Sequence, residues 1–139
     1  MIKFTVKEWM NELVVFVEPG NTVSEALSRM RRRYINSLIV KTNGDHSVYG
    51  ILTSKDVSDK IVAMDKNPSV VLVKEIMTTP LITIDQNSSL KECALLMSEK
   101  HIHHLPVVDD KKKIVGMISA TDFLVAAEAL GKAPGDRII

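Results

Sequence analysis

Two short strings in this sequence each place a side-chain hydroxyl three residues before an aspartate. Residues 50–56 read GILTSKD, and residues 116–122 read GMISATD. The hydroxyl and carboxylate residues are Thr53 and Asp56 in the first string, and Ser119 and Asp122 in the second. A carboxylate has two acceptor oxygens and can accept hydrogen bonds from two neighbouring hydroxyls of a sugar. Asp56 and Asp122 are therefore candidates for binding a sugar.

The same spacing has a structural alternative. Ser or Thr followed by Asp three residues later is also the pattern of a helix N-cap, which stabilises a helix by roughly 0.5–2 kcal/mol. The two roles are compatible, because the N-terminus of a capped helix offers backbone N–H groups to an anion. Gly50 and Gly116 lie within strand patterns, where a missing side chain usually marks the close approach of a backbone or a ligand.

Histidines supply a second candidate chemistry. Residues 101–104 read HIHH, and a protonated imidazole can bind phosphate. If His103 and His104 do so, affinity should weaken as the pH rises past about 6.5, the ordinary pKa of histidine. His101 and His103 would share one face of an extended segment and could ligate zinc or nickel, but no carboxylate lies nearby in sequence. No metal site is expected, and solvated surface histidine is the remaining alternative.

Both strings belong to an internal duplication of the chain. The other matched blocks, 67 residues apart, are VKEWM at 6–10 with VKEIM at 73–77, and TVSEALSRM at 22–30 with SLKECALLM at 89–97. The two glycine strings match at an offset of 66 residues. The order of the blocks predicts two related repeats. Their expected bounds are 1–66 and 67–131, with a tail at 132–139.

Each repeat carries signals for the helices and strands that position its string. Thr22 with Glu25, and Ser89 with Glu92, have capping-box spacing, so a helix is expected after Thr22 and after Ser89. Short β-branched runs predict paired strands, and a further helix should follow each glycine string. The predicted strands are 37–40, 48–53, 105–108 and 113–119, the loops between them 41–47 and 109–113, and the following helices about 55–64 and 121–130. Each repeat is thus an α+β unit of the order β-α-β-β-α.

Composition narrows the function classes. The 139 residues are 45% hydrophobic and 25% charged, with a net charge of +1, so the chain is neither disordered nor a bulk polycation. The single cysteine, Cys93, excludes a disulfide framework and a multi-cysteine metal site, as expected in a reducing cytosol. No apolar run approaches the roughly 20 residues of a membrane span, and the start lacks a signal-peptide region. A cytoplasmic protein is expected.

The sequence also lacks the patterns of catalysis. It has no P-loop, no multi-ligand metal motif and no recognisable grouping of serine, histidine and acid. Aromatic residues make up only 4% of the chain, so no base-stacking platform is evident. An enzyme is not expected, and no cofactor is required.

Together the matched blocks resemble a tandem pair of CBS domains, the arrangement called a Bateman module. The resemblance rests on VKEIM, on SLKECALLM, on HHLPVVD at 103–109 and on GMISATD, in that order. It covers the chain up to about residue 131. The first repeat departs from the pattern, with NSLIVK where the family usually has a proline-valine strand.

The resemblance implies a fold and a function. The two β-α-β-β-α repeats should pack sheet to sheet in a pseudo-two-fold module, commonly a homodimer, with two clefts between the repeats. Such modules generally sense AMP, ADP, ATP or S-adenosylmethionine and signal to an effector protein. The family aspartate holds the ribose diol and the hydroxyl faces the sugar or phosphate, which assigns these roles to Asp56 and Asp122, and to Thr53 and Ser119.

The resemblance also implies contacts for the adenine and the phosphates. Adenine needs an apolar slot with backbone hydrogen bonds. The family supplies it from the strand after the VKEIM block, here Thr79, Pro80, Leu81 and Ile82, with Leu13 and Val14 among the counterparts in the first repeat. Basic residues before the L-P-V strand contact phosphate in some members, and His103 and His104 occupy those positions. The sequence does not say which cleft they serve.

Two alternatives stay open at this point. The chain could be an assembly domain that dimerises without a small molecule, in which case the strings are helix caps only. Less expected is nucleic-acid binding through the basic runs 31–33 and 111–113, since solvated charge is the usual role of such runs.

Overall fold

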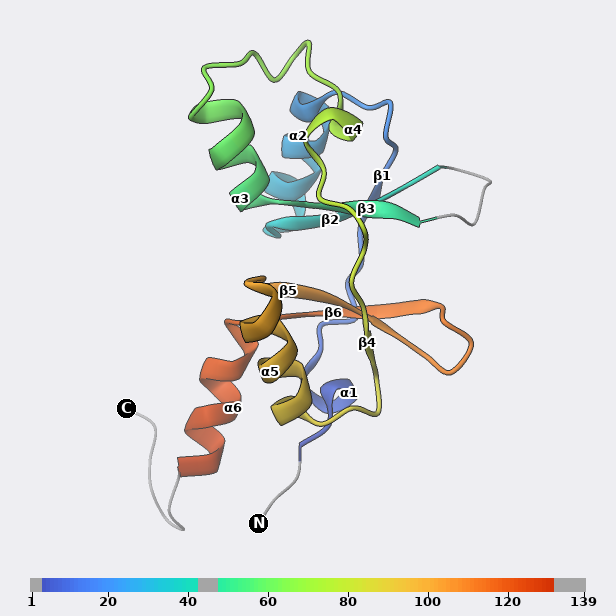
Figure 1. The fold of residues 1–139 in the computed structure, drawn as a ribbon, viewed down its shortest axis with the longest axis vertical. Helices are drawn as coiled ribbons and strands as arrows, with labels where there is room; N and C mark the ends of the chain where they lie inside the picture. The colour runs from blue at the N-terminus through green and yellow to red at the C-terminus, as the bar shows by residue number, and fades with distance from the viewer. Residues whose placement is uncertain (1–3, 43–47, 132–139) are drawn as a thin grey trace. The chain divides into compact units, whose positions relative to one another are not determined.

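The computed structural model describes residues 4–42 and 48–131, which divide into two compact units (Figure 1). The Asp56 unit comprises residues 14–82, and the Asp122 unit comprises the residues up to 13 together with those from 83 onward. The predicted tail at 132–139, and most of the predicted loop at 41–47, lie outside the described residues.

The Asp56 unit contains a three-stranded sheet in the order β1-β2-β3. β1 (Phe16–Val17) is parallel to β2 (Ser37–Lys41), which is antiparallel to β3 (Val48–Thr53). Parallel neighbours need a crossover connection, and helix α2 (Val23–Arg33) provides it. The remaining helices are α3 (Ser54–Val57), the π-helix η1 (Ser58–Val62) and α4 (Val73–Ile76).

An aliphatic core joins this sheet to its helices. On α2 the buried residues Val23, Ala26 and Met30 recur every three to four positions and so form one apolar stripe. The same cluster takes in residues of β2, β3, η1 and α4, namely Leu38, Val40, Leu52, Ile61, Val73 and Ile76. Burial of this apolar surface is the main force that holds the unit together.

The Asp122 unit repeats the same plan with a sheet in the order β4-β5-β6. β4 (Ile84–Asp85) is parallel to β5 (His104–Val108), which is antiparallel to β6 (Ile114–Ser119). Its helices are α1 (Val6–Trp9), α5 (Leu90–Lys100) and α6 (Asp122–Gly131). The predicted α+β class and the order β-α-β-β-α are confirmed in both halves of the sequence.

The predicted helix starts are also confirmed, with one difference in detail. Ser89 and Glu92 form the complete capping box of α5. Thr22 caps α2 by accepting from Glu25 N, but the Glu25 carboxylate accepts from Asn21 Nδ2 at 2.7 Å instead of closing the box. The Glu25 carboxylate binds the Asn21 amide, so only the Thr22 side of the predicted capping box forms.

One predicted strand is wrong. Residues Thr79 to Ile82 are irregular, and the strand after the VKEIM block is only the two residues of β4. Pro80 has no N–H to donate to a strand ladder, which explains why regular pairing does not include this segment. In the first repeat Leu13 and Val14 likewise precede β1 and are not part of it.

Each unit combines segments from both repeats, as Figure 1 shows for α1 and α4. Thr78, from the second repeat, exchanges two backbone hydrogen bonds with Ile51 of β3, at 2.8 and 3.1 Å. Asn11, from the first repeat, exchanges two with Met117 of β6, both at 2.8 Å. The front segment of each repeat therefore lies against the glycine string of the other.

Candidate functional site

Thr53 and Asp56 form a helix cap at the start of α3. Asp56 Oδ2 accepts from Thr53 N at 2.9 Å and from Thr53 Oγ1 at 3.3 Å, while Thr53 Oγ1 lies 3.4 Å from Asp56 N. The capping alternative raised by the sequence is thus present in the structure. One of the two carboxylate oxygens is engaged by it.

The other oxygen of Asp56 is engaged as well. Asp56 Oδ1 accepts from Thr78 Oγ1 at 2.7 Å and from Lys60 Nζ at 3.0 Å. The ammonium of Lys60 also donates to the carbonyl of Ile76, at 2.8 Å. Asp56 is only 5% exposed. Sequence reasoning singled out neither Thr78 nor Lys60, although the i,i+4 spacing of Asp56 and Lys60 was visible.

The second string has the same cap with fewer partners. Asp122 Oδ2 accepts from Ser119 N at 2.8 Å and from Ser119 Oγ at 3.2 Å, and Ser119 Oγ lies 2.7 Å from Thr121 Oγ1. Asp122 is half-buried. Among the residues that the structure describes, none hydrogen-bonds to Asp122 Oδ1, so this oxygen can accept from a ligand.

The two glycines permit the close approach that the sequence predicts. A Cβ added to Gly50 would collide with the backbone carbonyl of Thr78. A Cβ added to Gly116 would lie 2.5 Å from Met10 Sδ and 3.0 Å from the carbonyl of Asn11. In both units the missing side chain makes room for the segment of the other repeat, and this segment carries the adenine-slot candidates.

The structure distributes the adenine-slot candidates between the units. Thr79 and Pro80 are exposed and Leu81 and Ile82 half-buried, all in the Asp56 unit. They follow directly on Thr78, which contacts Asp56. The exposed Leu13 is the last residue of the first segment of the Asp122 unit, and the half-buried Val14 that follows it is the first residue of the Asp56 unit.

The histidines lie beside the second string. His104 pairs with Ser119 across β5 and β6, and the carbonyl of His103 accepts from Ala120 N at 2.9 Å. His103 is exposed and His104 half-buried. Burial lowers the pKa of His104 below 6.5, and the nearby His103 lowers it further, while Asp122 opposes the shift. The imidazole of His104 is therefore mainly neutral at pH 7.

A cavity next to these histidines was not foreseen from the sequence. It has a volume of about 350 Å³ in the Asp122 unit. Its lining residues are Ala94, Met97, Ser98, His101, Ile102, His103, Ala120 and Phe123. One feature of the duplication could have indicated this cavity: the second repeat has Ala94 at the position where the first repeat has the larger Leu27. Leu27 packs against the core of the Asp56 unit.

Two observations bear on metal binding. Within residues 4–42 and 48–131, no three or more His, Cys, Asp or Glu side chains gather as a metal site would require. Burial raises the pKa of the Cys93 thiol to about 11, which disfavours the thiolate that binds metals. Over the same ranges, none of the helices is long and apolar enough to cross a bilayer.

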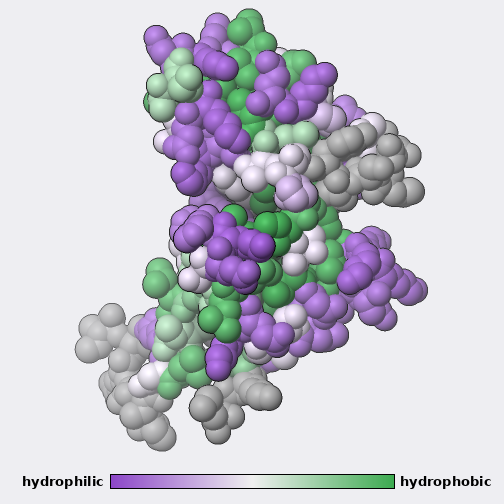
Figure 2. Space-filling model, viewed as in Figure 1, coloured by the Kyte–Doolittle hydropathy of each residue, from purple (hydrophilic) through white to green (hydrophobic). Residues whose placement is uncertain are grey.

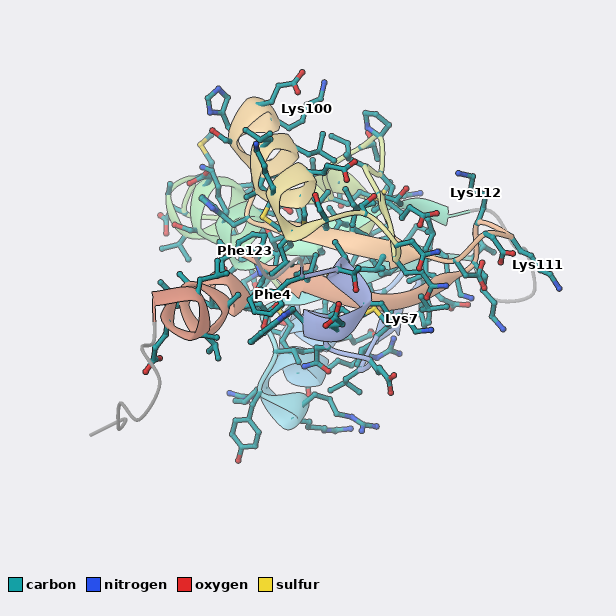
Figure 3. All side chains as sticks on the ribbon, turned by 90° about the horizontal axis from the view of Figure 1, so that it is seen from below. Phe4, Lys7, Lys100, Lys111, Lys112 and Phe123 are labelled. Atoms are coloured by element: carbon teal, nitrogen blue, oxygen red, sulfur yellow. The ribbon has the colours of Figure 1, made fainter. Side chains whose placement is uncertain are left out.

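The basic residues 31–33 and 111–113 are exposed to solvent. Residues 31–33 are exposed in the last turn of α2. Lys111 and Lys112 project away from the tip of the turn between β5 and β6 (Figure 3). The usual surface role of charged runs accounts for both clusters.

The fold and the paired strings define a two-domain regulatory module. The CBS domain model matches residues 6–63 and residues 73–129, so the chain belongs to the CBS domain family and contains two CBS domains. The CBS domain-containing protein YhcV of Bacillus subtilis is 31% identical over 121 residues, which are 87% of this chain and 84% of YhcV. The chain spans less than two thirds of other curated relatives, 63% in one case and 17% in another.

Solved structures share the fold. A hexameric CBS-CP12 protein from bloom-forming cyanobacteria is 27% identical with a TM-score of 0.85, over 99% of this chain and 79% of that protein. The CBS domain pair of protein MJ0100 was solved in complex with 5′-methylthioadenosine and S-adenosyl-L-methionine. It is 25% identical with a TM-score of 0.80, over 93% of this chain and 99% of that chain.

Proposed function

We propose that this CBS pair binds an adenosyl ligand, an adenine nucleotide or S-adenosylmethionine, and passes its occupancy to an effector protein. The observation that carries the proposal is that each unit brings the hydroxyl-aspartate string of one repeat against the front segment of the other. The proposal is supported by the MJ0100 pair, which was solved with two adenosyl compounds.

The expected contacts follow from the chemistry of the parts. Asp122 Oδ1 accepts from the ribose diol, while Ser119 lies at the start of α6 near the sugar or phosphate. In the Asp56 unit the corresponding residues are Thr53 and Asp56. The segment from Thr79 to Ile82, and that around Leu13 and Val14, supply apolar contact and backbone groups for adenine.

His103 and His104 are the proposed phosphate contacts of the Asp122 unit. Burial lowers the pKa of His104 below 6.5. As the pH rises, His104 therefore loses its positive charge, and any contribution of this charge to phosphate binding, before the pH reaches 6.5. At neutral pH His104 acts as a neutral hydrogen-bonding group. Phosphate affinity that declines as the pH rises from 5.5 supports a role for these histidines, and constant affinity contradicts it.

The module is proposed to act without catalysis and as a homodimer. Large apolar side chains are exposed on neighbouring helices of the Asp122 unit: Leu95 on α5, and Leu124, Val125 and Leu130 on α6. Figure 2 shows hydrophobic residues at the surface along α6. Such patches are typical of association surfaces. A hexameric CBS relative gives further support to self-association.

Thermal unfolding with AMP, ADP, ATP and S-adenosylmethionine tests the proposal. A ligand at 100 times its dissociation constant adds about 2.7 kcal/mol to the free energy of unfolding, so binding raises the melting temperature visibly. Asp122→Ala should diminish this rise, whereas Asp110→Ala, which alters an exposed aspartate in the turn before β6, should leave it unchanged.

The second candidate function is ligand-independent assembly. The helix caps of Thr53 and Ser119, together with the exposed apolar residues of α5 and α6, favour it. Absence of any thermal shift with all four compounds, together with a stable dimer, would select this function over ligand sensing.

A further inference from the structure

The two strings are equivalent in sequence but not in their surroundings. The carboxylate of Asp56 accepts four hydrogen bonds from protein groups, two at each oxygen, and is 5% exposed. That of Asp122 accepts its described hydrogen bonds at one oxygen and is half-buried. A ligand hydroxyl can reach the second carboxylate without displacing a protein donor.

The duplication identifies the residues that cause this difference. At the offset of the strings, Lys60 corresponds to Ala126, whose side chain is buried and carries no charge. Thr78 corresponds to Asn11 at the offset of the front blocks. At the position from which Lys60 contacts Asp56, the Asp122 unit therefore supplies no ammonium.

The backbone after the first string also differs. Lys60 lies in the π-helix η1, with an i→i+5 hydrogen bond of 2.9 Å from Ala63 N to Ser58 O, whereas α6 is a regular α-helix. From η1 the ammonium of Lys60 contacts both Asp56 Oδ1 and the carbonyl of Ile76 in α4. Lys60 thereby links η1, α3 and α4.

This arrangement opposes ligand binding at the first string. A ribose diol that bound Asp56 would have to displace Thr78 or Lys60, and would leave a mostly buried carboxylate without its cation. Separating such a pair is costly, because the charge loses its partner without gaining bulk water.

We infer that Lys60 and Thr78 hold Asp56 as an internal anchor, so that each chain binds one adenosyl ligand, at the Asp122 string. The stoichiometry rests on the proposed function, because it assumes that the ligand is an adenosyl compound. The anchoring of Asp56 by Lys60 and Thr78 does not depend on that function. Lys60 is then the residue that sets the number of ligands bound per chain.

Calorimetric titration with AMP, ATP and S-adenosylmethionine tests the stoichiometry. The expected result is one ligand per chain, unchanged in Asp59→Asn, which alters an exposed aspartate of η1, and lost in Asp122→Asn. The reciprocal variant Ala126→Lys places an ammonium four residues after Asp122 and should weaken binding at least tenfold, while Ala126→Met controls for size. Two ligands per chain in the unaltered protein, or loss of binding in Lys60→Ala, would overturn the inference.

A double-mutant cycle tests the anchor without any ligand. Urea unfolding of Lys60→Met, Asp56→Asn and the double variant should show strong coupling, with the unfolding constant departing from the additive value by roughly fivefold or more. The exposed pair Lys55–Asp59, with the same i,i+4 spacing and a 2.6 Å separation, is the matched control and should be nearly additive. Additivity at Lys60 and Asp56 refutes the anchor. Coupling without binding of any of the three compounds refutes the proposed function instead.

Discussion

Thr78 Oγ1 donates a 2.7 Å hydrogen bond to Asp56 Oδ1, although the two residues belong to different repeats. The contact depends on the backbone pairing of Thr78 with Ile51, which brings the front segment of the second repeat to the first string. Thr78→Val should therefore lower the free energy of unfolding by about 1–2 kcal/mol, because a buried carboxylate loses a donor. Urea unfolding measures this, with the exposed neighbour variant Thr79→Val as control. Equal effects of the two variants would contradict a specific role for Thr78.

The glycines should differ in their tolerance of a methyl group. Gly50→Ala meets the Thr78 carbonyl, which backbone pairing holds in place, and should destabilise the protein by about 1–3 kcal/mol. Gly116→Ala first meets the flexible end of Met10 and should cost less. Gly20→Ala has no atom within 4 Å of the new methyl and serves as the control. Thermal unfolding of the three variants gives the order, and a reversed order for Gly50 and Gly116 would refute this account.

His104 should make stability depend on pH on the acidic side of neutrality. Its pKa is lower in the folded protein than the ordinary 6.5, so the unfolded chain binds the proton more tightly. The free energy of unfolding should thus be unaffected by His104 above pH 6.5 and fall as the pH drops below it. His104→Gln should lose less stability between pH 7.5 and 5.5 than the unaltered protein. His101→Asn is the control, since His101 is exposed and asparagine tolerates its left-handed backbone; an unchanged profile for His104→Gln would contradict the prediction.

Cys93 should be unreactive in the folded protein. Its side chain is fully buried, and its pKa of about 11 leaves almost no thiolate at pH 8. A disulfide reagent should label it only as fast as the protein unfolds, and rapidly in concentrated urea. Fast labelling under native conditions would show that the packing around α5 opens far more readily than the structure indicates.

The apolar surface of α6 should be needed for self-association. Leu124→Glu combined with Leu130→Glu replaces side chains that are 71% and 57% exposed, so the fold should survive while the charges oppose an apolar interface. Light scattering after size exclusion should show a lower mass than for the unaltered protein. Glu128→Gln on the same helix is the control. An unchanged mass in the double variant would place the interface elsewhere.

The local features of the fold could be predicted because their causes lie within a few residues of sequence. The caps at Thr22 and Ser89, the strands before each glycine string and the helices after them were predicted from spacing and residue type alone. Thr79 to Ile82 were wrongly predicted as a strand, because the prediction followed the family resemblance and did not consider the missing donor of Pro80. The π-helix η1 has no sequence signal that we recognise.

The residues of the candidate site were chosen from the sequence, and their role in ligand binding stays a prediction; the groups around them were not foreseen. A repeated motif can be recognised from the sequence alone, and the duplicated string contains Thr53, Asp56, Ser119 and Asp122. The contacts of Thr78 and Lys60 with Asp56 depend on the packing around this carboxylate, and Ala126 at the position of Lys60 offers no such contact to Asp122.

Two CBS repeats, their order of elements and the hydroxyl-aspartate pair in each are evident from the amino-acid sequence. The pairing of Asn11 with Met117 and of Thr78 with Ile51, by which each unit contains parts of both repeats, is evident only in the folded protein. The physical reason is that these backbone pairings join segments distant along the chain, and their partners are selected by the space that Gly116 and Gly50 leave open. The secondary-structure propensity of neighbouring residues does not predict pairing between such distant segments.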